Sequence, residues 1–126
     1  MLSRNTYIEI NTKNYISNYC YLESSAKTEV MPVIKGNGYG CGIVEMAKLN
    51  ESIGVKVTAV AFFEEAVEIR KAGVKSDILI FNCLNSSYFV KAVEIGATIT
   101  LYSKKQLNEY YNEDRAAFLK GKYQIN

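Results

Sequence analysis

Histidine and tryptophan are absent from this sequence of 126 residues, and proline occurs once, at Pro32. Without histidine the chain cannot itself form a Ser-His or Cys-His nucleophile pair, an HExxH zinc site or an imidazole proton shuttle. Any proton transfer that the chain performs therefore has to use lysine, tyrosine, cysteine or a carboxylate.

Cysteine is scarce and unevenly placed. The three cysteines, Cys20, Cys41 and Cys83, are an odd number and have no CxxC spacing. This pattern argues against a disulfide framework and against a zinc ribbon. We therefore expect reduced, mostly buried thiols and no metal site.

Long apolar runs and a strong net charge are also missing. No apolar stretch approaches the roughly 18 residues of a membrane span, and the opening "MLSRNTYIEI" lacks the apolar segment of a signal peptide. The 15 Lys and Arg against 13 Asp and Glu leave a net charge of +2, with no basic run. We expect a cytoplasmic chain that binds neither nucleic acid nor membrane and whose partner is a small molecule or a protein.

What the sequence does contain is a regular alternation of short apolar runs with segments of helical spacing. Nearly continuous apolar runs are typical of strands buried on both faces. They occur at Val30–Ile34, Val57–Phe62, Asp77–Phe81, Thr98–Leu101 and Lys122–Ile125. The segments between them each have one apolar face. Upstream, the pattern predicts a short strand over Tyr7–Asn11 and a helix over Thr12–Ala26.

Residues that begin and end helices agree with this alternation. Ser103, followed three residues later by Gln106, has the spacing of a capping box. Gly54, Gly73 and Gly96 each stand where a helix needs a left-handed residue after its last turn. The element boundaries are therefore predicted independently of the apolar pattern.

Alternating units with short connections predict an α/β fold, with a parallel sheet covered by helices. The periodicity does not decide between an open and a closed sheet. A complete eight-stranded barrel needs about 250 residues, and this chain supplies about half of that with its 126. Because no proline- or glycine-rich linker divides the chain, we expect one structural unit.

The stretch "VMPVIKGNGYGCG" ends an apolar run on Lys35 and continues with glycine at every second position. It is not a dinucleotide fingerprint, because the last glycine of GxGxxG would fall on Cys41 or Ile43. It is not a Walker A loop either, since there the lysine follows the glycines. A common nucleotide-phosphate motif is therefore not present at this loop.

Lys35 nonetheless occupies a position where parallel α/β folds bind ligands, the carboxyl end of a strand. An apolar setting there would favour the neutral amine, which can form a Schiff base. The glycines would permit a sharp turn and the close approach of a bulky flat group. The same residues also fit a lysine that only caps the strand and extends into solvent. The residues alone leave both interpretations open.

The segment "PVIKGNGYGCG" resembles the pyridoxal-phosphate signature of the alanine racemase family, usually VVKANAYGHG. "TAVAFFEEAVEIRKAGVKSDILIFN" is similar to the segment that follows it in the family, with its Glu-Glu-Ala helix, arginine and glycine turn. "YIEINTKNYISNYCYL" resembles the family's start, and "GATITLYSKKQLNEY" its fourth strand and helix. The resemblance runs in the family's order over nearly all 126 residues.

This resemblance implies a parallel (β/α) barrel of TIM type, with residues 1–126 as an incomplete N-terminal portion of about half a barrel. It implies a pyridoxal-phosphate-dependent racemase that interconverts L-alanine and D-alanine for the cell wall. Lys35 would hold the cofactor as a Schiff base and act as one of two bases. Tyr39 would contact the cofactor phosphate, and Phe81 would lie in the apolar wall near its ring. The alternatives are a packed loop tyrosine at Tyr39 and a simple core aromatic at Phe81.

The chain departs from the family pattern in three ways. Gly36 and Gly38 replace the usual alanines, and Cys41 replaces the usual histidine. The family's Asp-Thr-Gly-Met segment, its pyridine-facing arginine and its C-terminal β domain with a second catalytic tyrosine have no counterpart in these residues. The resemblance also implies a homodimer for a complete enzyme, and without these segments we expect no activity for residues 1–126 alone. The alternatives are a non-catalytic truncated half-barrel or assembly module, and a related racemase for serine or ornithine.

Overall fold

A computed structural model describes residues 6–125 of the chain. The described chain forms two compact units, one up to Val30 and one from Met31 onward, instead of the single unit that we expected. No linker composition marks the division in the sequence. Within the described residues, none of the helices is both long enough and apolar enough to cross a membrane.

The first unit is built around helix α1, Thr12–Ala26, with the bounds that the sequence predicts. The Asn11 side chain accepts a hydrogen bond from the Asn14 N–H at 3.0 Å and so caps the first turn. The strand predicted over Tyr7–Asn11 is wrong, since these residues are not part of a strand. A strand requires a neighbour for its N–H and C=O groups, and this unit contains no other described strand.

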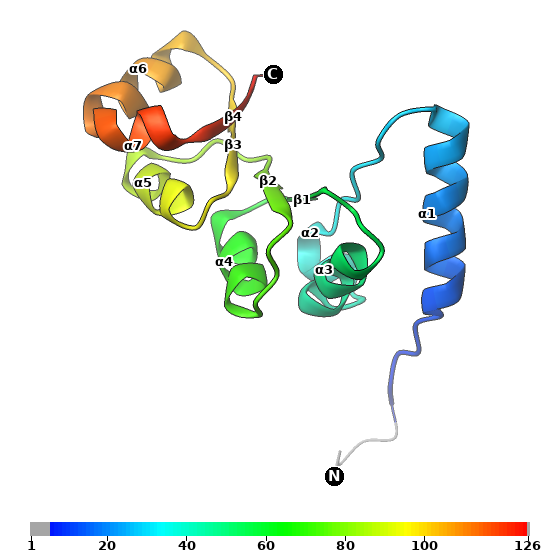
Figure 1. Ribbon diagram of the computed structural model, residues 1–126. Helices are drawn as coiled ribbons and strands as arrows, with labels where there is room; N and C mark the ends of the chain where they lie inside the picture. Colours follow the sequence, from blue (N-terminus) through cyan, green and yellow to red (C-terminus); the bar gives the residue numbers. More distant parts are fainter. Residues whose placement is uncertain (1–5, 126) are drawn as a thin grey trace. The chain divides into compact units, whose positions relative to one another are not determined.

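The second unit contains a four-stranded sheet in the order β1-β2-β3-β4 (Figure 1). Every neighbouring pair is parallel, as the alternation predicts. The strands are β1 (Val57–Val60), β2 (Asp77–Ile80), β3 (Thr98–Leu101) and β4 (Lys122–Ile125). Four of the five predicted runs in this part of the chain are thus confirmed as strands.

The remaining run, Val30–Ile34, forms only a single parallel bridge, from Val33 to Ala59 of β1. The Pro32 carbonyl accepts from the Ala59 N–H, and the Ile34 N–H donates to the Ala59 carbonyl, both at 2.9 Å. Pro32 has no N–H to donate and therefore shortens the ladder at this edge. The prediction of a full strand is wrong, but the segment does lie beside β1 in parallel direction.

The helices of this unit are α2 (Lys35–Tyr39), α3 (Ile43–Ser52), α4 (Phe63–Lys71), α5 (Ser86–Glu94), α6 (Lys104–Glu113) and α7 (Arg115–Lys120). Helices α4 to α7 connect the successive strands, whereas α2 and α3 precede β1 (Figure 1). The three glycines predicted to end helices, Gly54, Gly73 and Gly96, do have left-handed φ angles of 83°, 89° and 66°. Helix α7 was not predicted, because its start depends on one short signal, the Asp114 side chain that accepts from the Ala117 N–H.

The two faces of the sheet have different surroundings. Alternate residues such as Val60, Ile80 and Ile99 have no exposed surface and form the core with the helices. Phe89 of α5 stacks on Tyr110 of α6 within this core, with ring centroids 4.5 Å apart. The opposite face of the sheet lines an open hollow, described below with the site.

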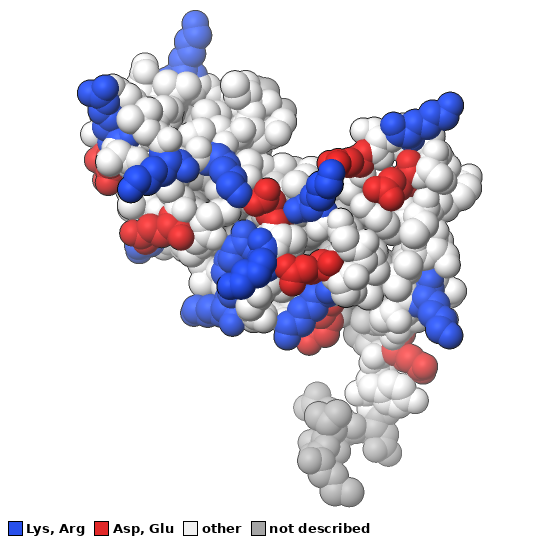
Figure 2. All heavy atoms as spheres, viewed as in Figure 1, with Lys and Arg blue, Asp and Glu red and all other residues white. Residues whose placement is uncertain are grey.

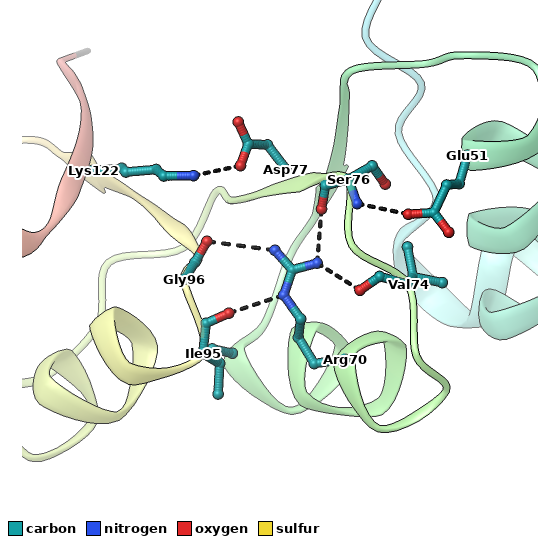
Figure 3. Close-up of polar contacts among 8 residues, drawn as sticks. All are labelled: Glu51, Arg70, Val74, Ser76, Asp77, Ile95, Gly96 and Lys122. Atoms are coloured by element: carbon teal, nitrogen blue, oxygen red, sulfur yellow. Dashed lines mark hydrogen bonds and ion pairs between the residues drawn. The ribbon is translucent and has the colours of Figure 1, made fainter.

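Polar contacts hold together the loops that precede the strands (Figure 3). The Arg70 guanidinium donates to the carbonyls of Val74, Ser76, Ile95 and Gly96, at distances from 2.7 to 3.4 Å. Arg70 therefore joins the segment before β2 to the segment before β3. Burial lowers the pKa of Arg70, which reflects the cost of removing this cation from water.

Glu51 of α3 also binds the segment just before β2. Its carboxylate accepts from the backbone N–H groups of Lys75 and Ser76, at 2.5 and 2.7 Å. These two hydrogen bonds lower the pKa of Glu51 below its ordinary value of 4.5. The carboxylate form is therefore favoured in the folded protein.

Acid should accordingly weaken the fold through Glu51. A carboxyl group with a lowered folded-state pKa contributes stability above its unfolded pKa, and this contribution is lost as the pH falls through the folded value. We expect the free energy of unfolding of the wild-type chain to fall more steeply below about pH 4.5 than that of Glu51→Gln. Urea unfolding at a series of pH values measures this difference. Glu68→Gln on exposed α4 surface is the control, and equal pH dependence of wild type and Glu51→Gln would contradict the prediction.

Candidate functional site

The turn that follows the first extended segment is left-handed. Gly36, Asn37, Gly38 and Tyr39 have φ angles of 62°, 55°, 64° and 52°. Glycine adopts this conformation freely, whereas Asn37 and Tyr39 each bear a cost of the order of 1 kcal/mol. The alternation of glycine with other residues therefore produces the sharp turn predicted from the sequence, and it leaves backbone strain directly beside Lys35.

Asn37 stabilises the turn from both its backbone and its side chain. The side-chain oxygen accepts from the Ile43 N–H at 3.0 Å, at the start of α3, and the carbonyl accepts from the Gly42 N–H at 2.9 Å. Asparagine is among the few non-glycine residues that tolerate a left-handed backbone. Sequence reasoning missed Asn37, although an asparagine between two glycines is a recognisable signal.

The glycines of the loop differ in what surrounds them. A Cβ atom at Gly38 would lie 3.1 Å from the Met46 side chain, so the turn packs tightly on α3 there. A Cβ at Gly36 or Gly40 would meet nothing within 4 Å. Open space therefore adjoins the loop at Gly36 and Gly40, whereas a side chain at Gly38 would require Met46 to shift.

Lys35 begins this turn at the carboxyl end of the Val33 segment, and its side chain is exposed. The residue before it, Ile34, is 3% exposed and is held on β1 by its N–H. The described residues do not bury the Lys35 side chain, and its exposure agrees with the alternative of a lysine that extends into solvent. The Lys35 side chain faces solvent, while the backbone just before it is hydrogen-bonded to β1.

Tyr39 lies four residues further along the same turn and is 67% exposed. The side chain of Tyr39 therefore extends largely into solvent in the described chain, and its contact with a phosphate stays a prediction. The structure brings Lys35 and Tyr39 into one turn, with a primary amine and a phenol both accessible from solvent.

Phe81 directly follows the carboxyl end of β2 and is half-buried. Its N–H donates to the Val60 carbonyl at 2.9 Å, and its own carbonyl accepts from the Tyr102 hydroxyl. Phe81 and Tyr102 line an open hollow of about 390 Å³ on the inner face of the sheet, together with residues such as Leu79 and Thr100. One side of Phe81 therefore faces this hollow, and its place in the wall of a site stays a prediction.

Glu65 of α4 connects the Lys35 turn to the end of β1. One carboxylate oxygen accepts from the Gly36 N–H at 2.6 Å. The other accepts from the N–H groups of Ala61 and Phe62, at 2.9 and 3.1 Å. Sequence reasoning missed Glu65, although its position three residues after Phe62 has the spacing of a capping-box glutamate.

The cysteines are free but not buried. Cys20 and Cys83 are exposed and Cys41 is half-buried, so the expectation of mostly buried thiols is wrong. The reason is their placement on loops and on α1, which has no buried residue. Among the described residues no three His, Cys, Asp or Glu side chains cluster as metal ligands would. Figure 2 shows basic and acidic side chains interspersed on the face in view.

Parallel strands joined by helices, with an exposed lysine at the carboxyl edge, define this chain as an incomplete (β/α) barrel of TIM type. The chain belongs to the family described as "Alanine racemase, N-terminal domain", whose model matches residues 10–125.

Individual relatives agree with this assignment. The alanine racemase of Fusobacterium nucleatum is 37% identical over 81% of this chain and 29% of its own length. Alanine racemase 1 of Bacillus subtilis is 34% identical over 84% of this chain and 28% of its own. This chain thus spans less than a third of these curated relatives.

Solved structures show the same likeness. The alanine racemase of Bacillus anthracis with bound L-Ala-P superposes with a TM-score of 0.81 at 27% identity, over 90% of this chain and 30% of that one. The Clostridium difficile alanine racemase in complex with cycloserine gives a TM-score of 0.81 at 25% identity, over 94% and 34%. The four-stranded parallel unit therefore corresponds to part of an alanine racemase barrel.

Proposed function

We propose that this chain is the lysine-bearing N-terminal portion of a pyridoxal-phosphate-dependent alanine racemase, which interconverts L-alanine and D-alanine. The observation that supports this most is the exposed Lys35 amine on a strained turn at the carboxyl edge of the sheet, in a member of the alanine racemase family. The choice of alanine as substrate follows the curated relatives, which are alanine racemases.

The residues present fit the cofactor by their chemistry. The accessible amine of Lys35 can bond covalently to an aldehyde, and the exposed hydroxyl of Tyr39 can donate a hydrogen bond to a phosphate. Phe81 would contribute to the apolar wall of the site, because it already lines the hollow. When bound, pyridoxal phosphate supplies the electron sink for removal of the substrate α-proton.

In this proposal Lys35 has two roles. Its Nζ atom would hold the cofactor before the substrate binds, and after the substrate amine has displaced it, the freed amine would take up and return the α-proton on one face of the substrate. Racemisation by two bases also needs an acid–base group on the opposite face. The family resemblance assigns that group to a C-terminal β domain of a partner subunit in a cytoplasmic homodimer. We therefore propose that residues 1–126 bind the cofactor but do not racemise alanine alone.

Covalent trapping tests the cofactor assignment. Pyridoxal phosphate added to the chain should produce an absorbance band at about 420 nm. Borohydride should then fix the pyridoxyl group on Lys35 in preference to other lysines. Peptide mapping by mass spectrometry locates the label. A missing band, or a label spread evenly over Lys35 and exposed lysines such as Lys48 and Lys71, would contradict the proposal.

A further inference from the structure

Glu65 is bound to two separate segments of the chain through one carboxylate. Its Oε1 accepts from Gly36 at 2.6 Å, across 29 positions in sequence. Its Oε2 accepts from Ala61 and Phe62 at the end of β1, at 2.9 and 3.1 Å. A residue that only capped α4 would need the contacts with Ala61 and Phe62 but not the contact with Gly36.

The Gly36 contact bears directly on Lys35, because the Gly36 N–H belongs to the peptide group that follows the Lys35 Cα atom. The peptide group that precedes this Cα is held as well, since the Ile34 carbonyl accepts from the Gly38 N–H at 2.8 Å. With both flanking peptide planes fixed, the direction of the Lys35 Cα–Cβ bond is fixed too. Glycine at position 36, with φ 62°, has no side chain that could hold the turn otherwise.

We propose that Glu65 is a positioning residue for Lys35: its carboxylate holds the strained turn against the end of β1 and so sets the direction of the lysine side chain. This role rests on the proposed function, in which Lys35 holds the cofactor. A carboxylate suits it because two acceptor oxygens serve three N–H donors, and because the start of α4 favours negative charge.

Two substitutions separate positioning from simple capping. Glu65→Gln keeps the length but leaves one acceptor oxygen, and its NH₂ group would face an N–H donor. Glu65→Asp keeps the charge near Ala61 and Phe62, but it is one methylene shorter and cannot span to Gly36 at the same time. Glu64→Gln is the matched control, since Glu64 is exposed on the same turn of α4.

The experiment has two measurements on the 126-residue chain. Amide hydrogen exchange at Gly36, followed by NMR without cofactor, reports the contact itself. Pyridoxal phosphate with borohydride, followed by peptide mapping, reports the share of label on Lys35 relative to Lys48. We expect both Glu65 variants to exchange the Gly36 amide about tenfold faster and to lower the Lys35 share about tenfold, with Glu64→Gln unchanged.

The outcomes distinguish this proposal from the one on which it rests. No labelling of Lys35 in the wild type would overturn the cofactor assignment, and the positioning role with it. Wild-type labelling that stays unchanged in a folded Glu65→Asp or Glu65→Gln would overturn only the positioning role. Loss of the folded far-UV circular dichroism spectrum in both variants would show that Glu65 supports the whole unit, and this too would overturn the proposal.

Discussion

Replacing Lys35 with alanine is expected to lower alanine racemisation by about 1000-fold or more in a chimera that joins this chain to the remaining part of Bacillus subtilis alanine racemase 1. That relative is a suitable acceptor, because it is 34% identical over 108 residues. The loss should be this large because one amine would both hold the cofactor and exchange the α-proton. Formation of D-alanine from L-alanine, measured by chiral chromatography, gives the rate.

Two controls make the result specific to Lys35. The unmutated chimera must first show the absorbance band at about 420 nm, which establishes that the two joined parts form a site. Lys48→Ala on α3 removes an exposed lysine of the same unit and should retain activity. Substantial turnover by a chimera with Lys35→Ala would refute the catalytic role assigned to this residue.

Replacing Arg70 with alanine is expected to cost about 3 kcal/mol of the free energy of unfolding. Four backbone carbonyls in the loops before β2 and β3 would lose their cationic donor (Figure 3), and all four contacts are partly buried. Arg70→Lys should recover only a fraction, because an ammonium group is a point charge without the planar fork of donors. Urea unfolding followed by circular dichroism measures both variants.

The adjacent lysine provides the control for Arg70. Lys71 is exposed on the same helix, so Lys71→Ala should change the unfolding free energy by less than about 0.5 kcal/mol. An Arg70→Ala variant as stable as Lys71→Ala would show that the four contacts contribute little in water. The same comparison at high salt separates the hydrogen bonds from long-range charge effects.

The strands and most helices of the second unit were predictable because their signals are local. Nearly continuous apolar runs are typical of buried strands, and β1, β2 and β3 all fall within such runs, whereas β4 is largely exposed. The same local reasoning failed at Tyr7–Asn11, where the composition suits a strand but no neighbouring strand accepts its backbone. It partly failed at Val30–Ile34, because Pro32 interrupts pairing with β1.

The candidate site was predictable in part for the same reason. Lys35 and Tyr39 stand out because they lie in one short glycine-rich segment, whose left-handed turn the glycines favour. The exposure of Lys35 and of the cysteines was not predictable, since exposure depends on what packs against a residue from distant parts of the chain. The family resemblance pointed to Phe81, but only the sheet places it at the rim of the hollow.

The sequence by itself thus determined the alternation of strands and helices, the glycine-rich turn after Lys35 and the family, because each depends on spacing between near neighbours. The tertiary structure alone decided how the lysine turn is held. Gly36 meets the Glu65 carboxylate across 29 positions. Such contacts form only when parallel strands bring the ends of separate segments to one edge of the sheet, so no local pattern encodes them.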